Sequence, residues 1–190
     1  MAIVLLDRDG VINKNRDDHV TRWEDFRFLP RSLEAMAAMR RLGFRLAVVT
    51  NQSAVGRGLL TSEALGEIHR RMQAECASRG AAIEAVFACL HTPWDGCDCR
   101  KPRPGLFHWA MAALDEPPEA CVTIGDSLSD LRAAEAIGLP FVLVRTGHGE
   151  ETLRRLTPHE HARLLVAGDL WEAYQAIRVY FHPRRRLEAA

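Results

Sequence analysis

The sequence lacks a net charge, and it lacks a long apolar run. Of its 190 residues, 25 are lysine or arginine and 25 are aspartate or glutamate, and the pI is near 7.1. This balance gives no reason to expect a nucleic-acid or acidic-membrane partner, and no apolar run approaches the roughly 18 residues that a membrane span requires. The N-terminus enters a strand pattern directly and shows no signal peptide. We therefore expect a cytoplasmic protein with no nucleic-acid and no membrane partner. Because no long exposed apolar stripe is evident, we expect a monomer.

Repeats and low-complexity segments are absent as well, and the chain instead alternates strand and helix patterns. Apolar runs typical of buried strands occur at 2–7, 44–50, 83–89, 121–126 and 140–144. Helical patterns occur at 31–43, 61–80, 104–114, 127–138 and 169–181, with Ser32 and Thr61 or Ser62 as N-caps. Such alternation produces a parallel sheet with helices on both faces. We predict one Rossmann-like α/β domain over residues 1–182, with a minimal cap, and a frayed tail over 183–190.

Polar clusters follow four of the predicted strands. In chain order, they are Asp7 and Asp9, then Thr50, Asn51, Gln52 and Ser53, then Arg100 and Lys101, and finally Asp126 and Asp130. Taken singly, each has an ordinary explanation as a turn or a helix cap, for example with Asp126 or Ser127 capping the helix that follows. In parallel sheets, however, ligands bind outside the carboxyl ends of the strands. Four clusters on that one edge therefore indicate an active site.

The acidic residues of these clusters suit magnesium and phosphate chemistry. Neighbouring carboxylates both stay ionised only when a cation lies beside them, and Mg²⁺ takes oxygen ligands that here would come from Asp7, Asp126 and a backbone carbonyl near Asp9. Asp7, directly after the strand, is the candidate nucleophile. Asp9 is the candidate general acid and base, and Thr50 and Lys101 are candidates to stabilise the phosphoryl group.

The cysteines are unevenly distributed. Three of the five fall in the segment CLHTPWDGCDC, whose pattern Cys-x-His-x5-Cys-x-Cys fits a closed tetrahedral zinc site. The expected zinc ligands are Cys89, His91, Cys97 and Cys99. Zinc would order a loop over 89–103 that leads directly into Arg100 and Lys101. The other two thiols, Cys76 and Cys121, are expected to pack in a helix and a strand.

The order of the motifs carries a resemblance. DRDGVIN, TNQS, RKP and GDSLSD occur in the order and spacing of the four motifs of the haloacid-dehalogenase-like (HAD) phosphatases, and the resemblance covers about residues 2–145. It implies that Asp7 is the nucleophile, Asp9 the acid and base, and Asp126 a magnesium ligand. It also implies that Thr50 and Lys101 hold the phosphoryl group. Asp130, at the second acidic position of the last motif, is expected to support the metal site rather than bind the metal.

Within that superfamily, the zinc loop together with TNQSAVGRG and CRKPRPG resembles the D-glycero-D-manno-heptose 1,7-bisphosphate 7-phosphatases. The resemblance implies magnesium-dependent removal of the C7 phosphate, in the synthesis of ADP- or GDP-heptose for surface polysaccharide. The residues expected to contact this phosphorylated sugar are Arg8, Asn15, Arg16, Asp17, Asp18, Asn51, Gln52, Ser53 and Arg100. His19 stands where the family has an aromatic residue, and Ala54 stands where a glycine is common.

Four other functions fit parts of the pattern. Histidinol-phosphate phosphatases share the zinc loop and are the nearest alternative. A phosphomutase would use the same aspartates but needs a capping insert to exclude water, which this length disfavours. A phosphoacceptor signalling domain carries its acceptor aspartate after the third strand, where this chain has Cys89. A non-catalytic, zinc-stabilised phosphate-binding module predicts that Asp7→Asn leaves function intact.

Overall fold

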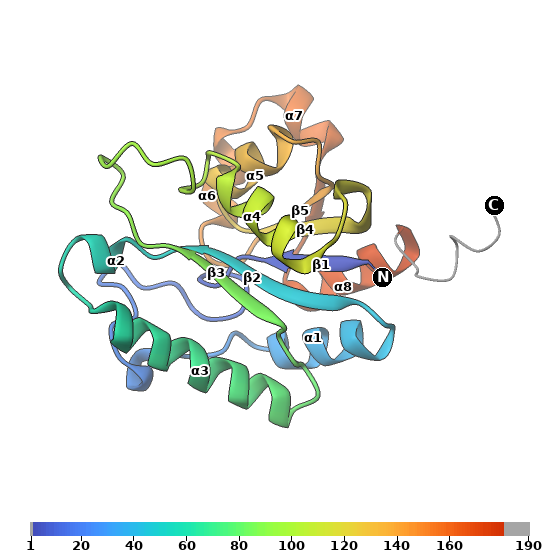
Figure 1. The fold of residues 1–190 in the computed structure, drawn as a ribbon. Helices are drawn as coiled ribbons and strands as arrows, with labels where there is room; N and C mark the ends of the chain where they lie inside the picture. Colours follow the sequence, from blue (N-terminus) through green and yellow to red (C-terminus); the bar gives the residue numbers. More distant parts are fainter. Residues whose placement is uncertain (1, 181–190) are drawn as a thin grey trace.

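A parallel sheet lies at the centre of the molecule (Figure 1), which is a computed structural model that describes residues 2–180. In that part of the chain the sheet has six strands in the order β3-β2-β1-β4-β5-β6, and every neighbouring pair is parallel. The strands are β1 (Ile3–Leu6), β2 (Arg45–Asn51), β3 (Ala85–Cys89), β4 (Cys121–Gly125), β5 (Phe141–Val144) and β6 (Leu165–Ala167). The expected tail at 183–190 lies outside the described residues.

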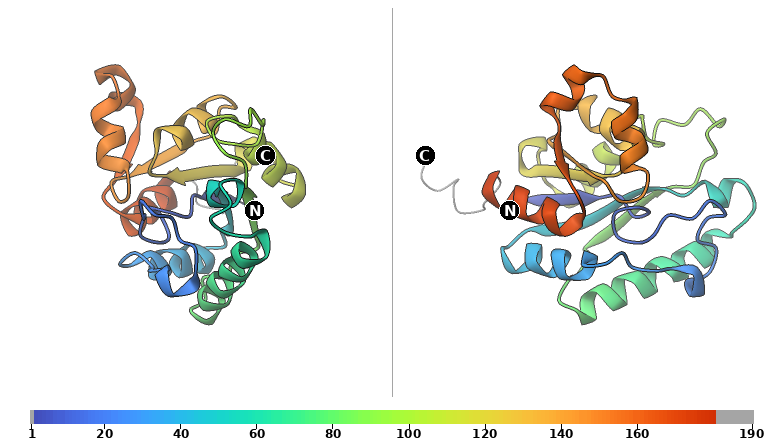
Figure 2. Two further views of the ribbon diagram at one scale, coloured as in Figure 1. Left: turned by 90° about the vertical axis from the view of Figure 1, so that its left-hand side faces the viewer. Right: turned by 180° about the vertical axis from the view of Figure 1, so that it is seen from behind.

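Helices cover both faces of the sheet (Figures 1 and 2). The α-helices are α1 (Ser32–Arg41), α2 (Ser53–Gly56), α3 (Ser62–Ser78), α4 (Gly105–Leu114), α5 (Leu128–Glu135), α6 (Gly149–Arg155), α7 (Pro158–Arg163) and α8 (Leu170–Tyr180). Two short 3₁₀ helices, η1 (Trp23–Asp25) and η2 (Pro118–Ala120), lie in connections. Helices α1, α3 and α8 share one hydrophobic cluster with the sheet, and α4 and α5 share another on the opposite face.

The alternation of side chains along β1 explains its unbroken apolar run. Val4 and Leu6 pack with α1, α3 and α8, whereas Ile3 and Leu5 pack with α4 and α5. All four are buried, because a strand in the middle of a covered parallel sheet has no solvent-facing side. None of the helices within residues 2–180 has the length and apolar character needed to cross a lipid bilayer.

The structure confirms the five predicted strands and the five longer helices to within a few residues at their ends. Strand β6 and helices α2, α6 and α7 were not predicted, since each is too short to show a hydrophobic period. Thr61 caps α3 through a hydrogen bond from Ala64 N to its Oγ1 (3.2 Å). The prediction that Ser32 caps α1 is wrong. Arg31 precedes the helix with φ of 62°, and the Ser32 hydroxyl donates to Leu29 O at 2.9 Å.

The carboxyl ends of the strands meet on the left of Figure 1, where α2 and the loop after β3 also lie. Register places these ends side by side, because Leu6 at the end of β1 pairs with Val48 on one side and with Ile124 on the other. Asp7 follows at once, and its backbone N–H extends the ladder to Ile124 O at 2.9 Å. The fold thus gathers the four polar clusters at one edge of the sheet, as the sequence predicts.

Candidate active site

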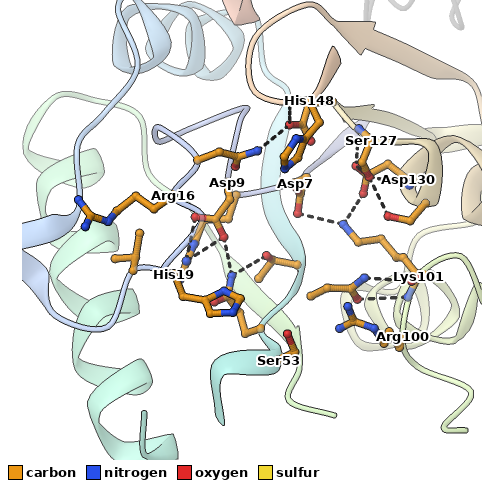
Figure 3. Close-up of a pocket in the computed structure, with 18 of the residues that line it drawn as sticks. Asp7, Asp9, Arg16, His19, Ser53, Arg100, Lys101, Ser127, Asp130 and His148 are labelled. Carbon is orange, nitrogen blue, oxygen red and sulfur yellow. Dashed lines mark hydrogen bonds and ion pairs between the residues drawn. The ribbon is translucent and has the colours of Figure 1, made fainter. Parts of the chain in front are cut away.

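A buried lysine links two of the acidic clusters (Figure 3). The Lys101 ammonium donates to Asp7 Oδ1 at 2.9 Å, to Val49 O at 2.7 Å, and to Asp130 Oδ1. Burial by itself would lower the pKa of Lys101, but the charges of Asp130 and Asp7 outweigh it and raise that pKa. The ammonium therefore stays charged and keeps all three of its protons engaged.

Three carboxylates surround this single ammonium. Oxygens of Asp7, Asp126 and Asp130 all lie within 4.8 Å of one another. Burial, and then repulsion between these neighbours, raises the pKa of Asp126 to about 8; burial, partly offset by Lys101, raises that of Asp7 to about 6. One ammonium does not balance three ionised carboxylates, so without a further cation Asp126 keeps a proton near pH 7, and a divalent cation can take the place of that proton.

The free oxygens of the cluster belong to two of these residues. Asp130 is fully used, because besides Lys101 it accepts from Ser127 N (3.1 Å) and Ser127 Oγ (2.5 Å) and completes the capping box of α5. Within residues 2–180, no hydrogen bond reaches Oδ2 of Asp7 or Oδ1 of Asp126. Two unpartnered carboxylate oxygens form an all-oxygen donor set, which fits Mg²⁺. The supporting position expected for Asp130 agrees with this geometry.

Asp126 lies against two glycines. A Cβ on Gly10 (φ +86°) or on Gly147 (φ +59°) would come within 2.0 Å of Asp126 Oδ2. Both positions therefore require glycine for two reasons, the positive φ and the lack of room for a side chain. His148 N donates to that oxygen at 2.7 Å and Asn15 Nδ2 at 3.1 Å. The loop after β5, which carries Gly147 and His148, was missed in the sequence. Its signal was the run Gly-His-Gly after a strand that ends at the same edge.

Asp9 is held by three other side chains. Arg8 Nη2 donates to both of its oxygens at 2.9 and 2.8 Å, Asn13 Nδ2 to Oδ1 at 2.8 Å, and Gln52 Nε2 to Oδ2 at 2.7 Å. Burial would raise the pKa of Asp9, but the charge of Arg8 and these hydrogen bonds together lower it. The Arg8 side chain has 0% exposure. Its guanidinium supports Asp9 from below the cavity floor, and the expectation that Arg8 also contacts a substrate stays a prediction.

The residues at the end of β2 and just after it mainly hold other active-site residues in position. The Asn51 carboxamide pairs with the backbone of Lys101, donating to its O at 3.0 Å and accepting from its N at 3.2 Å. Gln52 Nε2 donates to Thr50 Oγ1 at 3.0 Å as well as to Asp9. Thr50 and Ser53 are buried and line the same cavity as the aspartates. Two of these side chains thus fix catalytic candidates in place.

A cavity of about 420 Å³ opens over these groups. Asp7 and Asp9 lie at its centre, and Arg16 and Arg100 lie at two sides of it (Figure 3). Most of the expected site residues line it: Asp7, Arg8, Asp9, Asn15, Arg16, Asp17, Thr50, Asn51, Gln52, Ser53, Arg100, Lys101 and Asp126. Asp18 does not line this cavity, and its carboxylate instead pairs with Arg16 at 2.6 and 2.9 Å.

The predicted zinc ligands converge at the start of the loop after β3. The three sulfurs of Cys89, Cys97 and Cys99 lie 3.4–3.8 Å apart, and His91 Nδ1 lies 3.2 Å from Cys99 Sγ. A tetrahedron with Zn–S bonds of about 2.3 Å has edges of about 3.8 Å, so these four groups fit around one zinc ion. The cluster ends two residues before Lys101. Cys76 and Cys121 are buried elsewhere, as expected.

Comparisons with known proteins place these features in a family. A family model described as HAD-hydrolase-like matches residues 98–173. The D-glycero-beta-D-manno-heptose-1,7-bisphosphate 7-phosphatase of Pseudomonas putida is 39% identical over 158 residues, which are 83% of this chain and 90% of that protein. The D-glycero-alpha-D-manno-heptose-1,7-bisphosphate 7-phosphatase of Mycobacterium tuberculosis is 40% identical over 136 residues, 70% of this chain and 72% of that protein.

Solved structures give the same result. The crystal structure of D,D-heptose 1,7-bisphosphate phosphatase from Bordetella bronchiseptica, complexed with magnesium and phosphate, is similar with a TM-score of 0.87 and 35% identity, over 95% of this chain and 99% of that one. The enzyme of the same name from Burkholderia thailandensis gives a TM-score of 0.70 and 32% identity, over 93% and 98% of the two chains.

Substitution of the zinc ligands should lower the activity of the active site. Cys97→Ala and Cys99→Ala are each expected to abolish zinc binding, because three ligands hold the ion far less tightly than four. The loop then no longer fixes Lys101, and we expect phosphatase activity to fall about tenfold or more. Zinc content and activity are measured together, with Cys76→Ala as the control that keeps both. Full activity in a zinc-free double variant would refute the link.

Binding of Mg²⁺ should release protons in a pH-dependent way. Burial and neighbouring acids raise the pKa of Asp126 to about 8, so at pH 7 most chains carry a proton that must leave before the metal binds. We expect release of about one proton per chain at pH 7 and close to none at pH 9. Calorimetric titration in two buffers of different ionisation enthalpy measures this number.

The same pKa values set the sign of the stability change. Since the folded values for Asp7 and Asp126 are raised above 3.8, their protonated forms stabilise the metal-free fold below that pH. The stabilisation is then lost as pH rises through about 6 and about 8. Metal-free protein should therefore melt at a lower temperature at pH 9 than at pH 6. Bound Mg²⁺ should reduce this difference between the two melting temperatures. Proton release that is absent at pH 7 would contradict this account.

Proposed function

We infer the reaction of this chain from its family, since it belongs to the D-glycero-D-manno-heptose-1,7-bisphosphate 7-phosphatases of the HAD-like hydrolases. We propose that it hydrolyses the C7 phosphate of that sugar bisphosphate. One observation carries the chemistry: Asp7 lines the cavity together with Asp9 and Asp126, and it keeps one oxygen bound to Lys101 while the other accepts no hydrogen bond within residues 2–180. Such a carboxylate is held in place and still has a lone pair with which to attack phosphorus.

In this proposal Asp7 attacks the phosphorus atom and the bond from phosphorus to the sugar oxygen breaks. Asp9 gives a proton to the departing sugar oxygen. Because Arg8 and the hydrogen bonds to Asp9 lower its pKa, this acid form depends on the negative charge of the bound phosphate, which raises that pKa. The product on the protein is an acyl phosphate of Asp7. Asp9 then takes a proton from a water molecule that attacks this acyl phosphate, which releases inorganic phosphate and restores the Asp7 carboxylate. Lys101 and the Thr50 hydroxyl stabilise the charge on the phosphoryl oxygens.

Magnesium, when bound, supplies positive charge that offsets the negative charge of the acids and of the phosphate. The residues proposed to hold it are Asp7 and Asp126, with a backbone carbonyl near Asp9. The unpartnered oxygens and the raised pKa of Asp126 support this choice. The Cys₃His cluster is proposed to hold zinc in a structural site, since all four positions are taken by protein groups.

Recognition of the sugar is proposed to come from the rim of the cavity. Arg100 and Arg16 lie at two sides of the aspartates and offer cations for a second phosphate group (Figure 3). Asn15, Asp17 and Ser53 add polar contacts from the same lining. Between β1 and β2 the chain forms only η1 and α1, so no inserted domain covers the site. We propose that the enzyme acts as a cytoplasmic monomer in the synthesis of nucleotide-activated heptose.

Phosphate release from a small substrate panel tests the proposal. The panel holds both anomers of the heptose bisphosphate, histidinol phosphate and a simple alkyl phosphate, each with Mg²⁺ or with a chelator. We expect the heptose bisphosphate to be hydrolysed with the highest kcat/KM. Asp7→Asn removes the nucleophile, and chelation removes the cation that would offset the charge of the acids and the phosphate, so each should lower the rate by about a thousandfold or more.

The outcomes separate the alternatives. Preference for histidinol phosphate would replace the proposed substrate while keeping the chemistry. Full activity in Asp7→Asn would exclude the covalent mechanism altogether. Phosphate binding without any turnover would favour the non-catalytic module. Asp115→Asn, at an exposed position just after α4 and outside the cavity lining, is a matched loss of one carboxylate that should retain the turnover.

A further inference from the structure

A histidine of α3 is joined to the active site through a buried arginine. His69 Nε2 lies 3.1 Å from Arg8 Nη1, while Nη2 of the same guanidinium contacts both oxygens of Asp9. His69 does not line the cavity that holds the aspartates. It is 8% exposed, and Arg8 is fully buried. The contact therefore joins a helix in the middle of the chain to the general acid and base, with no direct contact between His69 and the cavity.

The direction of the contact is set by chemistry. A guanidinium only donates hydrogen bonds, so His69 Nε2 must accept, and the ring must be neutral with its proton on Nδ1. Burial, and then the charge of Arg8, lowers the pKa of His69 to about 3, which agrees with a neutral ring. Among residues 2–180, Asp9 and His69 are the only side chains that accept from this guanidinium, and its Nε has no partner.

The arrangement differs from ordinary core packing. A histidine that only filled space would not need its lone pair aimed at a charged group. Here the ring nitrogen and the Asp9 carboxylate take opposite ends of one planar fork, and the Phe26 ring lies 5.9 Å from Arg8 Cζ. With both ends fixed, the guanidinium has one orientation. Its two bonds to Asp9 then set the plane of that carboxylate, which proton transfer requires.

We propose that His69 is a positioning residue, which orients Arg8 and through it the Asp9 carboxylate for proton transfer to the leaving group. The inference rests on the proposed function, because it needs Asp9 to act as general acid. His69 touches neither the substrate nor the reacting atoms. Its loss should therefore slow the transfer of the phosphoryl group to Asp7 only when the departing oxygen needs a proton, and leave metal binding unchanged.

A pair of substrates with different leaving groups separates this role from a general structural one. A sugar or alkyl phosphate expels a strongly basic alkoxide and needs the proton, whereas 2,4-dinitrophenyl phosphate expels a stable anion and does not. The parameter is kcat/KM, which ends with transfer to Asp7 and excludes later hydrolysis. For His69→Leu we expect kcat/KM to fall about tenfold with the heptose bisphosphate and less than about twofold with the aryl phosphate. The tenfold fall is smaller than the full contribution of general-acid catalysis, because Asp9 itself is still present.

Two further variants guard against misfolding. His69→Gln keeps an acceptor at the reach of Nε2 and should restore most of the activity on the sugar phosphate. His69→Asn is polar but too short to reach Arg8, and should behave like His69→Leu. Cys76→Ala, also buried in α3 and two turns further on, is the control: it should weaken the fold without changing the ratio between the two substrates.

The results also separate this inference from the proposed function. If the wild-type protein prefers histidinol phosphate, the proposed substrate fails, but the same comparison is made with that alkyl phosphate and still decides the inference. If His69→Leu and His69→Asn lower kcat/KM equally on the alkyl phosphate and the aryl phosphate, the role of His69 is structural and the proposal is overturned. Unchanged kcat/KM on the alkyl phosphate, or no recovery with Gln, would overturn it as well.

Discussion

The active site depends on one unequal balance of charge, in which three buried carboxylates share a single lysine. The Lys101 ammonium binds Asp7 and Asp130 directly, and Asp126 lies close enough to both to have its own pKa raised to about 8, mainly by burial. Removing one partner of a buried ion pair typically costs about 3–5 kcal/mol, because the other charge is left uncompensated. Loss of the Lys101 charge would therefore destabilise the whole cluster, whereas binding of a further cation would stabilise it.

The rest of the structure keeps these groups in position from different directions. Asn51 forms two hydrogen bonds with the backbone of Lys101, and the Cys₃His cluster lies just before Lys101 in the chain. Gly10 and Gly147 allow Asp126 to lie against bare backbone. Asp9 is held by a separate set of donors from Arg8, Asn13 and Gln52. Because the support of Asp9 is separate from that of Asp7, burial raises the pKa of Asp7 while Arg8 and its hydrogen bonds lower that of Asp9. In the absence of substrate, therefore, Asp9 is the more readily ionised of the two.

Much of this was predictable from the sequence, for reasons that are local. Asp7 and Asp126 directly follow strands, so their meeting follows from the parallel topology, whereas the zinc ligands were predictable from their spacing within the single segment 89–99. The support that Arg8 gives to Asp9 was not predicted, because the motif gives the position of Arg8 and not the direction of its buried side chain, which reaches Asp9 and His69 of α3. His69 gave no signal, since a histidine in an apolar helical stripe is indistinguishable from core. The loop at Gly147 and His148 comes near Asp126 only through the fold.

The central claim is that the surplus negative charge of this cluster binds a divalent cation between Asp7 and Asp126. The most direct test is a crystal structure with manganese, a magnesium substitute that can be located by its anomalous scattering, together with a phosphate mimic. We predict one anomalous peak in contact with the unpartnered oxygens of both residues, with Lys101 still bound to Asp7. A cavity with no peak at this position, or with the acids turned apart into solvent, would contradict the account.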